Sequence, residues 1–404
     1  MKNREKREGF SRRNFLSRSA AATVASIGLP GNMPAVAAEN AGQGTAPSEI
    51  AFRSAQPIWP QGREKEMNLW VGFRAAFEAP SGKHVYLRMT GCTFYHVYLN
   101  GQFHGWGPAR APLGFARVDL WDITPFLVKG KNLVCVEVAG YNVNSFYVMN
   151  EPSFIQAEVA ADSEVLASTA GSGQPFEARF LPQHIEKVQR YTFQRTFSEV
   201  YHMEEQSNAW RERADAPFEA VACAISAQRK LIARGVPFPN YPTRQPEMIA
   251  AEGEFDWSGK APKSLMEDRS IPSAARIGPD MLGYAWTDLA EIPYLELQKT
   301  QTTVNNRIDQ PYVCNQPIRL SASHFKTLDF GTNLPGFFGA HVTVHTPTKL
   351  YFTFDETLVD GDVDFKRLMC VNVVAYTLAP GEYNLETFEP YGLEFLKLMV
   401  LSGE

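Results

Sequence analysis

The sequence predicts an all-β protein built from two β-sandwich domains, of the jelly-roll or lectin-like kind, joined by a mixed, Pro-rich connection. Short runs of alternating apolar and polar residues recur with turn signals about every 8–12 residues, which is typical of sandwiches and not of α/β folds. The 29 glycines and 27 prolines are spread throughout and suit many short strands joined by turns. A chain of 404 residues, 44% of them hydrophobic, is large enough for two or three domains with packed cores.

Residues 1–38 have the three parts of a signal peptide. They begin with seven Lys and Arg residues, continue through a short Ala-rich stretch and reach the small-residue cleavage pattern Ala35-Val36-Ala37. The motif SRRNFL, which contains Arg12 and Arg13, matches the twin-arginine export signal. A basic surface tail is the alternative. The segment is too short and too polar to span a bilayer, and no transmembrane segment is expected after it. We therefore expect export by the twin-arginine (Tat) translocase to the periplasm or the cell exterior.

The charge of the chain argues against a nucleic-acid partner. The full sequence has a net charge of −5, and removal of residues 1–38 takes away seven basic and two acidic residues, which leaves −10. An acidic protein is repelled by a phosphate backbone. We therefore expect neutral sugars or other small partners, and no polyanion.

The first expected domain is a galactose-binding-like β-sandwich over residues 51–204, which follows a small, polar linker at residues 39–50. A hairpin is its clearest element. Tyr95 to Leu99 alternate as a strand, and Asn100-Gly101 is the strongest short-range hairpin signal because both turn positions need positive φ. The other expected strands are Trp70–Phe77, Val85–Met89, Leu133–Ala139, Ser153–Ala160, Glu164–Ala167, Phe176–Phe180 and Arg190–Tyr201, whereas Val118–Leu127 is expected as a loop.

Residues 205–306 are expected to connect the two domains. Ala209–Arg213 and Ala220–Ala233 are rich in Ala, Glu, Gln, Arg and Lys, which suits short helices or an irregular connection. Four prolines between positions 237 and 246 then favour an extended chain. The second β-sandwich is expected over residues 307–404. Its expected strands are Thr327–Phe330, Ala340–His345, Lys349–Asp355, Asn372–Leu378 and Phe395–Leu401.

Two stretches of the sequence carry a resemblance to a known family. The first is LDFGTNLPGF, from Leu328 to Phe337, and the second is Tyr98-Leu99-Asn100-Gly101 in the expected hairpin. They resemble a DFGxNxxG stretch and the N-terminal sandwich of bacterial α-L-rhamnosidases of glycoside hydrolase family 78. Residues 205–300 resemble the family least. Further matching positions are Phe354-Asp355-Glu356, Asn372, Tyr376-Thr377-Leu378, Phe388-Glu389-Pro390-Tyr391 and Phe395-Leu396-Lys397-Leu398.

The resemblance implies a rhamnose-containing glycan or glycoside as partner. Family members continue into a large (α/α)₆ barrel that carries the catalytic acids, and the sequence lacks the long alternating helices of such a barrel. No catalytic residue of the family can therefore be carried over. We expect a truncated or split form, with a catalytic barrel encoded downstream, or a complete stand-alone lectin-like protein.

Candidate carbohydrate-binding residues lie in two expected loops. Sugar binding needs aromatic rings against the C–H faces of the pyranose and polar side chains for the hydroxyls. Each candidate also has a structural alternative as a core aromatic, a surface ion-pair partner or a turn residue. The candidates are Trp106, Arg110, Tyr141, Asn142 and Asn144, with Tyr147 nearby.

An acidic cluster near the C-terminus is the candidate metal site. Asp360, Asp362 and Asp364 have the D-x-D-x-D spacing that could offer oxygen ligands to Ca²⁺, although no Glu stands at the last position of an EF-hand loop. A solvated loop is the alternative. Nearby Asp355 and Glu356 are neighbours on a strand and point to opposite faces, so they do not readily form the carboxylate pair of a glycosidase. Glycoside hydrolysis by the β-domains is therefore the least favoured hypothesis.

The remaining motifs assign no chemistry. The five cysteines are odd in number and widely spaced, so neither a disulfide framework nor a zinc site is assigned. Phosphate loops, nucleotide fingerprints and hydrolase elbows are missing from the sequence. The sequence favours non-catalytic sugar-binding or scaffold domains of a rhamnosidase-like protein.

Overall fold

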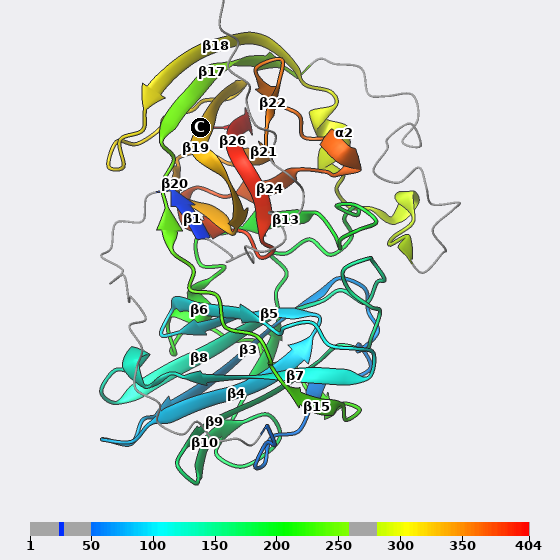
Figure 1. The fold of residues 1–404 in the computed structure, drawn as a ribbon, viewed down its shortest axis with the longest axis vertical. Helices are drawn as coiled ribbons and strands as arrows, with labels where there is room; N and C mark the ends of the chain where they lie inside the picture. Colours follow the sequence, from blue (N-terminus) through cyan, green and yellow to red (C-terminus); the bar gives the residue numbers. More distant parts are fainter. Residues whose placement is uncertain (1–23, 28–49, 258–280, 404) are drawn as a thin grey trace, which may run out of the picture.

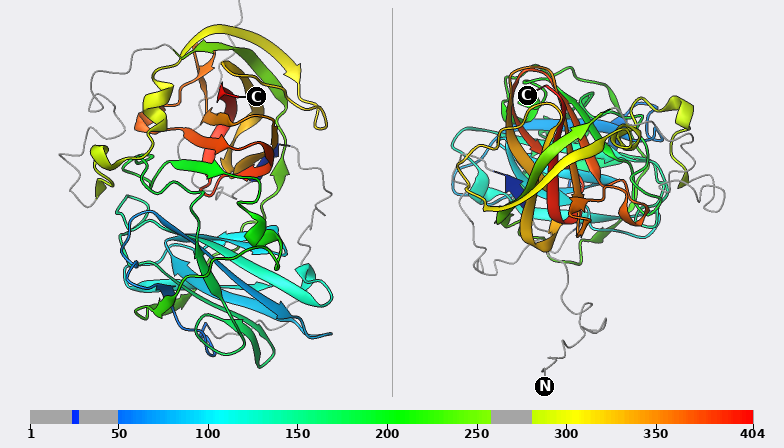
Figure 2. Two further views of the ribbon diagram at one scale, coloured as in Figure 1. Left: turned by 180° about the vertical axis from the view of Figure 1, so that it is seen from behind. Right: turned by 90° about the horizontal axis from the view of Figure 1, so that it is seen from above.

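The chain folds into two β-domains stacked along its long axis, as seen in Figure 1 and, from behind and above, in Figure 2. A computed structural model describes residues 24–27, 50–257 and 281–403. Strands dominate both domains, which confirms the all-β prediction. The helices of the described chain are single turns, α1 (Ala209–Glu212) and α2 (Pro293–Leu297) among them. None of its helices is long and apolar enough to cross a membrane.

The first domain is a sandwich of two sheets. The smaller sheet has the order β12-β3-β8-β5-β6, and the larger has the order β11-β10-β9-β4-β7-β15, with β2 and β14 beside it. The strands of the smaller sheet are β3 (Leu69–Glu78), β5 (Phe94–Leu99), β6 (Gln102–Gly107), β8 (Lys131–Gly140) and β12 (Glu177–Phe180). The strands of the larger are β2 (Ile58–Pro60), β4 (Val85–Cys92), β7 (Phe115–Asp122), β9 (Phe154–Ala161), β10 (Glu164–Ser168), β11 (Gln174–Pro175), β14 (Cys223–Ile225) and β15 (Lys230–Ala233).

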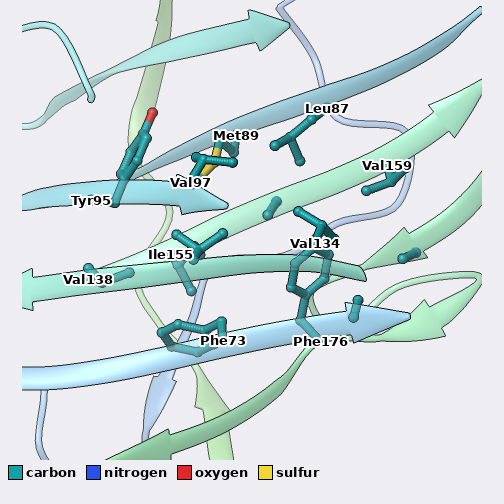
Figure 3. Close-up of a cluster of buried hydrophobic side chains, with 14 of the residues drawn as sticks. Phe73, Leu87, Met89, Tyr95, Val97, Val134, Val138, Ile155, Val159 and Phe176 are labelled. Carbon is teal, nitrogen blue, oxygen red and sulfur yellow. The ribbon is translucent and has the colours of Figure 1, made fainter. Parts of the chain in front are cut away.

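The core of the first domain lies between these sheets. Figure 3 shows Phe73, Tyr95 and Val134 from the smaller sheet together with Leu87 and Ile155 from the larger. All five side chains are buried, with exposed fractions of 0%. Nine of the ten residues of β8 are buried, in agreement with the expectation of a central strand from its continuous apolar run.

The predicted hairpin is confirmed. Strands β5 and β6 pair in antiparallel register, and their connecting residues Asn100 and Gly101 have φ values of 49° and 82°. Both values are positive, as the Asn-Gly turn requires.

One predicted loop is a strand, so that expectation was wrong. Residues 118–127 were expected as a loop, but β7 pairs antiparallel with β4 and parallel with β15. The polar residue Asp119 is accommodated inside β7 because Arg234 Nη1 lies 2.7 Å away and the Tyr95 hydroxyl donates to it at 2.5 Å. Both partners are distant in sequence, and the local pattern did not include them.

The second domain also has two sheets. The larger has the order β13-β24-β21-β26-β19-β17-β18, the smaller has the order β16-β1-β20-β25, and an apolar cluster lies between them. All five expected strands of this domain are present. The strands of the larger sheet are β13 (Glu199–Met203), β17 (Met248–Asp256), β18 (Gln301–Pro311), β19 (His324–Gly336), β21 (Thr348–Asp355), β24 (Val373–Leu378) and β26 (Tyr391–Ser402). The smaller has β1 (Val24–Ile27), β16 (Thr243–Arg244), β20 (Phe338–Val344) and β25 (Gly381–Glu386).

Strand pairing crosses the expected domain ranges. Strand β13, within the range expected for the first sandwich, pairs in parallel with β24 of the second domain. Residues 205–306, expected as a connection, supply β14 and β15 to the first domain and β16 to β18 to the second. Strand β1 lies within the expected signal peptide and pairs in parallel with β20. The chain between the two sandwiches therefore contributes to both.

Candidate functional site

A cavity of about 280 Å³ opens at one end of the first domain. Three connections form it: the junction of β4 and β5, the loop between β6 and β7, and the loop between β8 and β9. In an antiparallel sandwich such loops come together at one end of the sheets, where they are free of the core. The cavity is lined by Gly91, Cys92, Thr93, Phe94, Pro108, Ala109, Arg110, Ala111, Phe115, Ala116, Arg117, Ser145, Phe146, Tyr147, Val148, Met149, Glu151 and Phe154.

Aromatic side chains form one wall of this cavity. The rings of Tyr147 and Phe94 have centroids 5.2 Å apart, and Phe94 is buried beneath. Phe146 and Met149, at the rim, are 69% and 42% exposed. Exposed aromatic surface in a concave site is the kind of surface on which the apolar face of a sugar can rest.

Charged groups complete the lining. The guanidinium carbon of Arg110 lies 5.6 Å from the centre of the Tyr147 ring. Arg117 donates to three backbone carbonyl oxygens, those of Arg110, Ala233 and Arg234. Glu151 accepts from the Gly114 N–H at 2.6 Å and lies 3.7 Å from Arg229 Nε. The cavity therefore presents an aromatic face beside an exposed guanidinium.

Of the five predicted sugar-binding residues, Arg110 lines the cavity. Trp106 stacks on Phe94 at 4.9 Å and meets Phe337 of the second domain edge-on at 6.2 Å, which corresponds to its alternative as an interdomain aromatic. Tyr141 is buried, with an exposed fraction of 1%. These two aromatic residues support the wall from behind.

The two predicted asparagines are turn residues beside the cavity. Asn142 is buried with φ of 46°, and its Nδ2 donates to Ser153 Oγ at 2.7 Å and to the Glu66 carbonyl at 2.9 Å. Asn144 Oδ1 accepts from the Asn150 N–H at 2.8 Å. Both side chains hold the loop between β8 and β9, which places Tyr147. Phe146 and Glu151 were not among the candidates proposed from the sequence, although both line the cavity. Their position in a loop near Tyr147 could have indicated them.

The three predicted calcium ligands do not gather. Both carboxylate oxygens of Asp362 accept from Lys397 Nζ at 2.7 Å. The Asp364 carboxylate accepts from the backbone N–H of Lys366 at 3.1 Å. Asp360 occupies a turn position with φ of 52°. In the described parts of the chain, no group of three or more His, Cys, Asp or Glu residues is arranged to hold a metal ion.

The neighbouring acidic pair is bound to one arginine. Arg367 donates to both oxygens of buried Asp355, at 2.7 and 2.6 Å, and to Glu356 at 3.1 Å. The two carboxylates therefore share a guanidinium, although neighbours within a strand were expected to face apart. Asp355 is the last residue of β21, where the strand alternation ends.

A buried polar cluster joins the cavity to the domain interface. The Tyr147 hydroxyl donates to Glu389 Oε2 at 3.1 Å, and Arg195 Nη2 lies 3.1 Å from the same oxygen. Burial raises the pKa of Tyr147 well above its usual range. Glu389 belongs to the second domain and Tyr147 to the first, so the cavity wall is fixed by a contact between the domains.

Glu199 stabilises the same segment of the second domain. Its carboxylate accepts from the backbone N–H groups of Phe388 and Glu389, at 2.7 and 2.8 Å, and from the hydroxyls of Tyr201 and Tyr391. Complete burial raises the pKa of Glu199 to about 7, against the opposing effect of these donors.

His96 connects the first domain to that segment. Its Nε2 donates to the Phe388 carbonyl oxygen at 2.9 Å, and its ring stacks on Phe388 at 4.4 Å. Burial lowers the pKa of His96 to about 3, so the ring is neutral at pH 7. His96 and Phe388 are 292 positions apart in the chain, so no local pattern could have indicated the contact.

Comparisons with known proteins support the fold. No family model and no curated protein matches the chain. Among solved structures, the GH78 family rhamnosidase of Bacillus sp. GL1 matches with a TM-score of 0.65 at 16% identity, over 87% of this chain and 53% of that one. The α-L-rhamnosidases of Aspergillus terreus and Dictyoglomus thermophilum match with TM-scores of 0.46 and 0.43, at 15% and 12% identity, over 87% of this chain and 34% and 33% of theirs. The chain therefore spans about half the length of the Bacillus rhamnosidase, and over that span it has the same fold.

Proposed function

We propose that the chain provides the non-catalytic, carbohydrate-binding and scaffold β-domains of an exported α-L-rhamnosidase-like glycoside hydrolase. The cavity at the loop end of the first domain carries this proposal, because it combines an aromatic wall with an exposed guanidinium. A pyranose could rest its C–H face on Tyr147 and direct hydroxyls to Arg110. The fold shared with a GH78 rhamnosidase agrees with a rhamnose-containing glycan as partner.

The proposal also covers hydrolysis, export and calcium binding. Asp355 and Glu356 are engaged by Arg367, which supports leaving hydrolysis to a separate catalytic barrel of the rhamnosidase-like protein. Export by the Tat translocase to the periplasm or cell exterior rests on Arg12 and Arg13, which lie outside the described residues. Calcium at Asp360, Asp362 and Asp364 stays a sequence-based proposal, which titration with and without EDTA tests.

Calorimetric titration of the full chain with an L-rhamnose-containing oligosaccharide tests the sugar site. Tyr147→Ala should weaken binding about tenfold or more, because it removes the ring that the sugar would contact. Tyr147→Phe keeps that ring and should retain binding, which separates sugar contact from the hydrogen bond to Glu389. Tyr86→Ala, outside the cavity lining, is the matched control. Equal affinities of Tyr147→Ala and the unmodified chain would refute the site.

A second measurement tests the assignment of catalysis. The purified chain should show no turnover of an aryl α-L-rhamnoside. Turnover that is abolished by Asp355→Asn or Glu356→Gln would instead support catalysis by the β-domains. Sugar binding by a chain that no downstream catalytic domain accompanies would support the stand-alone lectin-like alternative.

A further inference from the structure

The cavity lining is electropositive although the chain as a whole is acidic. Of the described residues that line it, Arg110 and Arg117 are cationic and Glu151 alone is anionic. Glu151 is already engaged by the Gly114 N–H and lies near Arg229, which does not line the cavity. The positive charge of the lining thus exceeds its negative charge, while the full sequence carries a net charge of −5.

The two cavity arginines have no carboxylate partner in the described parts of the chain. Arg117 donates to carbonyl oxygens, which leave its charge uncompensated. Arg110 is exposed, and its guanidinium carbon lies 5.6 Å from the centre of the Tyr147 ring. Elsewhere in the structure arginines pair with acids, as in the contacts of Arg88 with Glu158 and of Arg211 with Glu137. An unpaired guanidinium at a concave apolar wall is a ready partner for an anion.

The neighbouring ring indicates what kind of anion fits. A carboxylate can accept two parallel hydrogen bonds from a guanidinium, and this geometry is favoured over a contact with a single hydroxyl. Tyr147 is half-buried beside Arg110, and its ring is part of the cavity lining on which the ring that carries the carboxylate would rest. A uronate sugar has both features in one residue: a pyranose face and a planar carboxylate at C6.

We propose that this cavity selects an acidic sugar, a uronate unit within a glycan, through a charge-assisted contact of its carboxylate with Arg110 while its ring rests on Tyr147. The proposal rests on the proposed sugar-binding function and names the ligand class. It differs from the neutral sugar expected from the net charge of the chain, because the local field of the cavity lining and not the sum over the surface acts on a bound ligand.

Titration of the full chain with sodium D-galacturonate and with D-galactose tests the proposal, since the two sugars differ at C6. Galacturonate should bind about tenfold more tightly at low salt. The preference should shrink when NaCl is raised from 50 to 500 mM, because ions screen an exposed charge pair. Sodium acetate is the probe for the bare anion.

Substitution of the arginine tests its role directly. Arg110→Gln should abolish the preference for galacturonate over galactose, whereas Arg110→Lys should keep part of it. Arg213→Gln, an exposed arginine that does not line the cavity, is the control and should leave the preference unchanged. Near-ultraviolet circular dichroism checks that each variant is folded.

The outcomes distinguish this inference from the proposed function. Equal binding of both sugars would overturn the selection of uronate and leave the sugar site standing. Acetate that binds as tightly as galacturonate would mean an adventitious ion only and would also overturn it. Binding of neither sugar would overturn the selection of uronate, and the titration with the L-rhamnose-containing oligosaccharide decides separately whether the sugar site stands.

Discussion

Glu199 has an environment very different from that of a surface carboxylate. It is buried and accepts four hydrogen bonds, two from backbone N–H groups and two from tyrosines. Those donors hold Phe388 and Glu389, which in turn contact His96 and Tyr147 of the first domain. A single side chain thus orders the segment on which the domain contact depends.

The pH dependence of stability should report this carboxyl group. Its pKa is about 7 in the folded chain, against 4.5 for an ordinary glutamate, so between these pH values the folded state binds more protons than the unfolded state. The contribution of Glu199 to the free energy of unfolding is therefore fully present below pH 4.5 and falls as pH rises to 7, by about 3 kcal/mol at most. Urea denaturation of the unmodified chain and of Glu199→Gln at pH 5 and pH 8 measures it. The free energy of unfolding of the unmodified chain minus that of Glu199→Gln should be lower at pH 8 than at pH 5.

The control for this experiment is Glu205→Gln, because Glu205 is exposed in the turn after β13. Its stability relative to the unmodified chain should not change with pH. A constant difference between Glu199→Gln and the unmodified chain across this range would contradict the raised pKa.

At the scale of elements, the hairpin of β5 and β6 depends on its turn. Gly101 has φ of 82°, and a Cβ added there would lie 3.3 Å from the Cα of Glu212 in α1. The turn therefore has two requirements: a backbone conformation that an L-residue rarely adopts, and space for the neighbouring helix.

Gly101→Ala should destabilise the chain by about 1–2 kcal/mol, since it meets both obstacles. Gly82→Ala is the matched control, because Gly82 has φ of 73° but no atom within 4 Å of an added Cβ. It should cost less, about 1 kcal/mol, from backbone strain alone. Thermal denaturation of both variants gives the comparison, and equal losses would show that contact with Glu212 has no effect.

At the scale of the whole molecule, a buried ion pair fixes the two domains together. Arg195 Nη2 lies 3.1 Å from Glu389, whose side chain is 3% exposed, and the Tyr147 hydroxyl donates to the same carboxylate. Arg195 lies in the segment before β13, Glu389 lies in the segment before β26, and Tyr147 lies in the loop between β8 and β9 of the first domain. The cavity wall and the domain interface are therefore one structural unit.

Arg195→Met should destabilise the chain by about 3 kcal/mol, because it leaves the carboxylate of Glu389 buried without its cation. The double variant Arg195→Met with Glu389→Gln should recover part of this loss, since it also removes the charge. Denaturation in urea measures stability, and small-angle X-ray scattering should show a larger radius of gyration if the domains separate. Arg307→Met, which removes an exposed pair with Asp309, is the control. An unchanged midpoint for Arg195→Met would show that the pair does not contribute to stability.

The sequence by itself determined most strands of the two sandwiches, the central position of β8, the Asn100-Gly101 turn and the all-β class. These features follow from alternation, apolar runs and turn chemistry, which act over a few neighbouring residues. It also singled out Arg110, which the structure places in the cavity lining, because a loop arginine next to aromatic residues is visible locally.

Only the tertiary structure decided which residues form the cavity and how the domains meet. It gave Asp119 a partner in Arg234 and so made β7 a strand, and it placed Trp106 between the domains and engaged Asp362 with Lys397. It also joined Glu199, His96 and Glu389 from positions far apart in the chain. The physical reason is that burial and charge compensation depend on distances in space, which residue order does not specify.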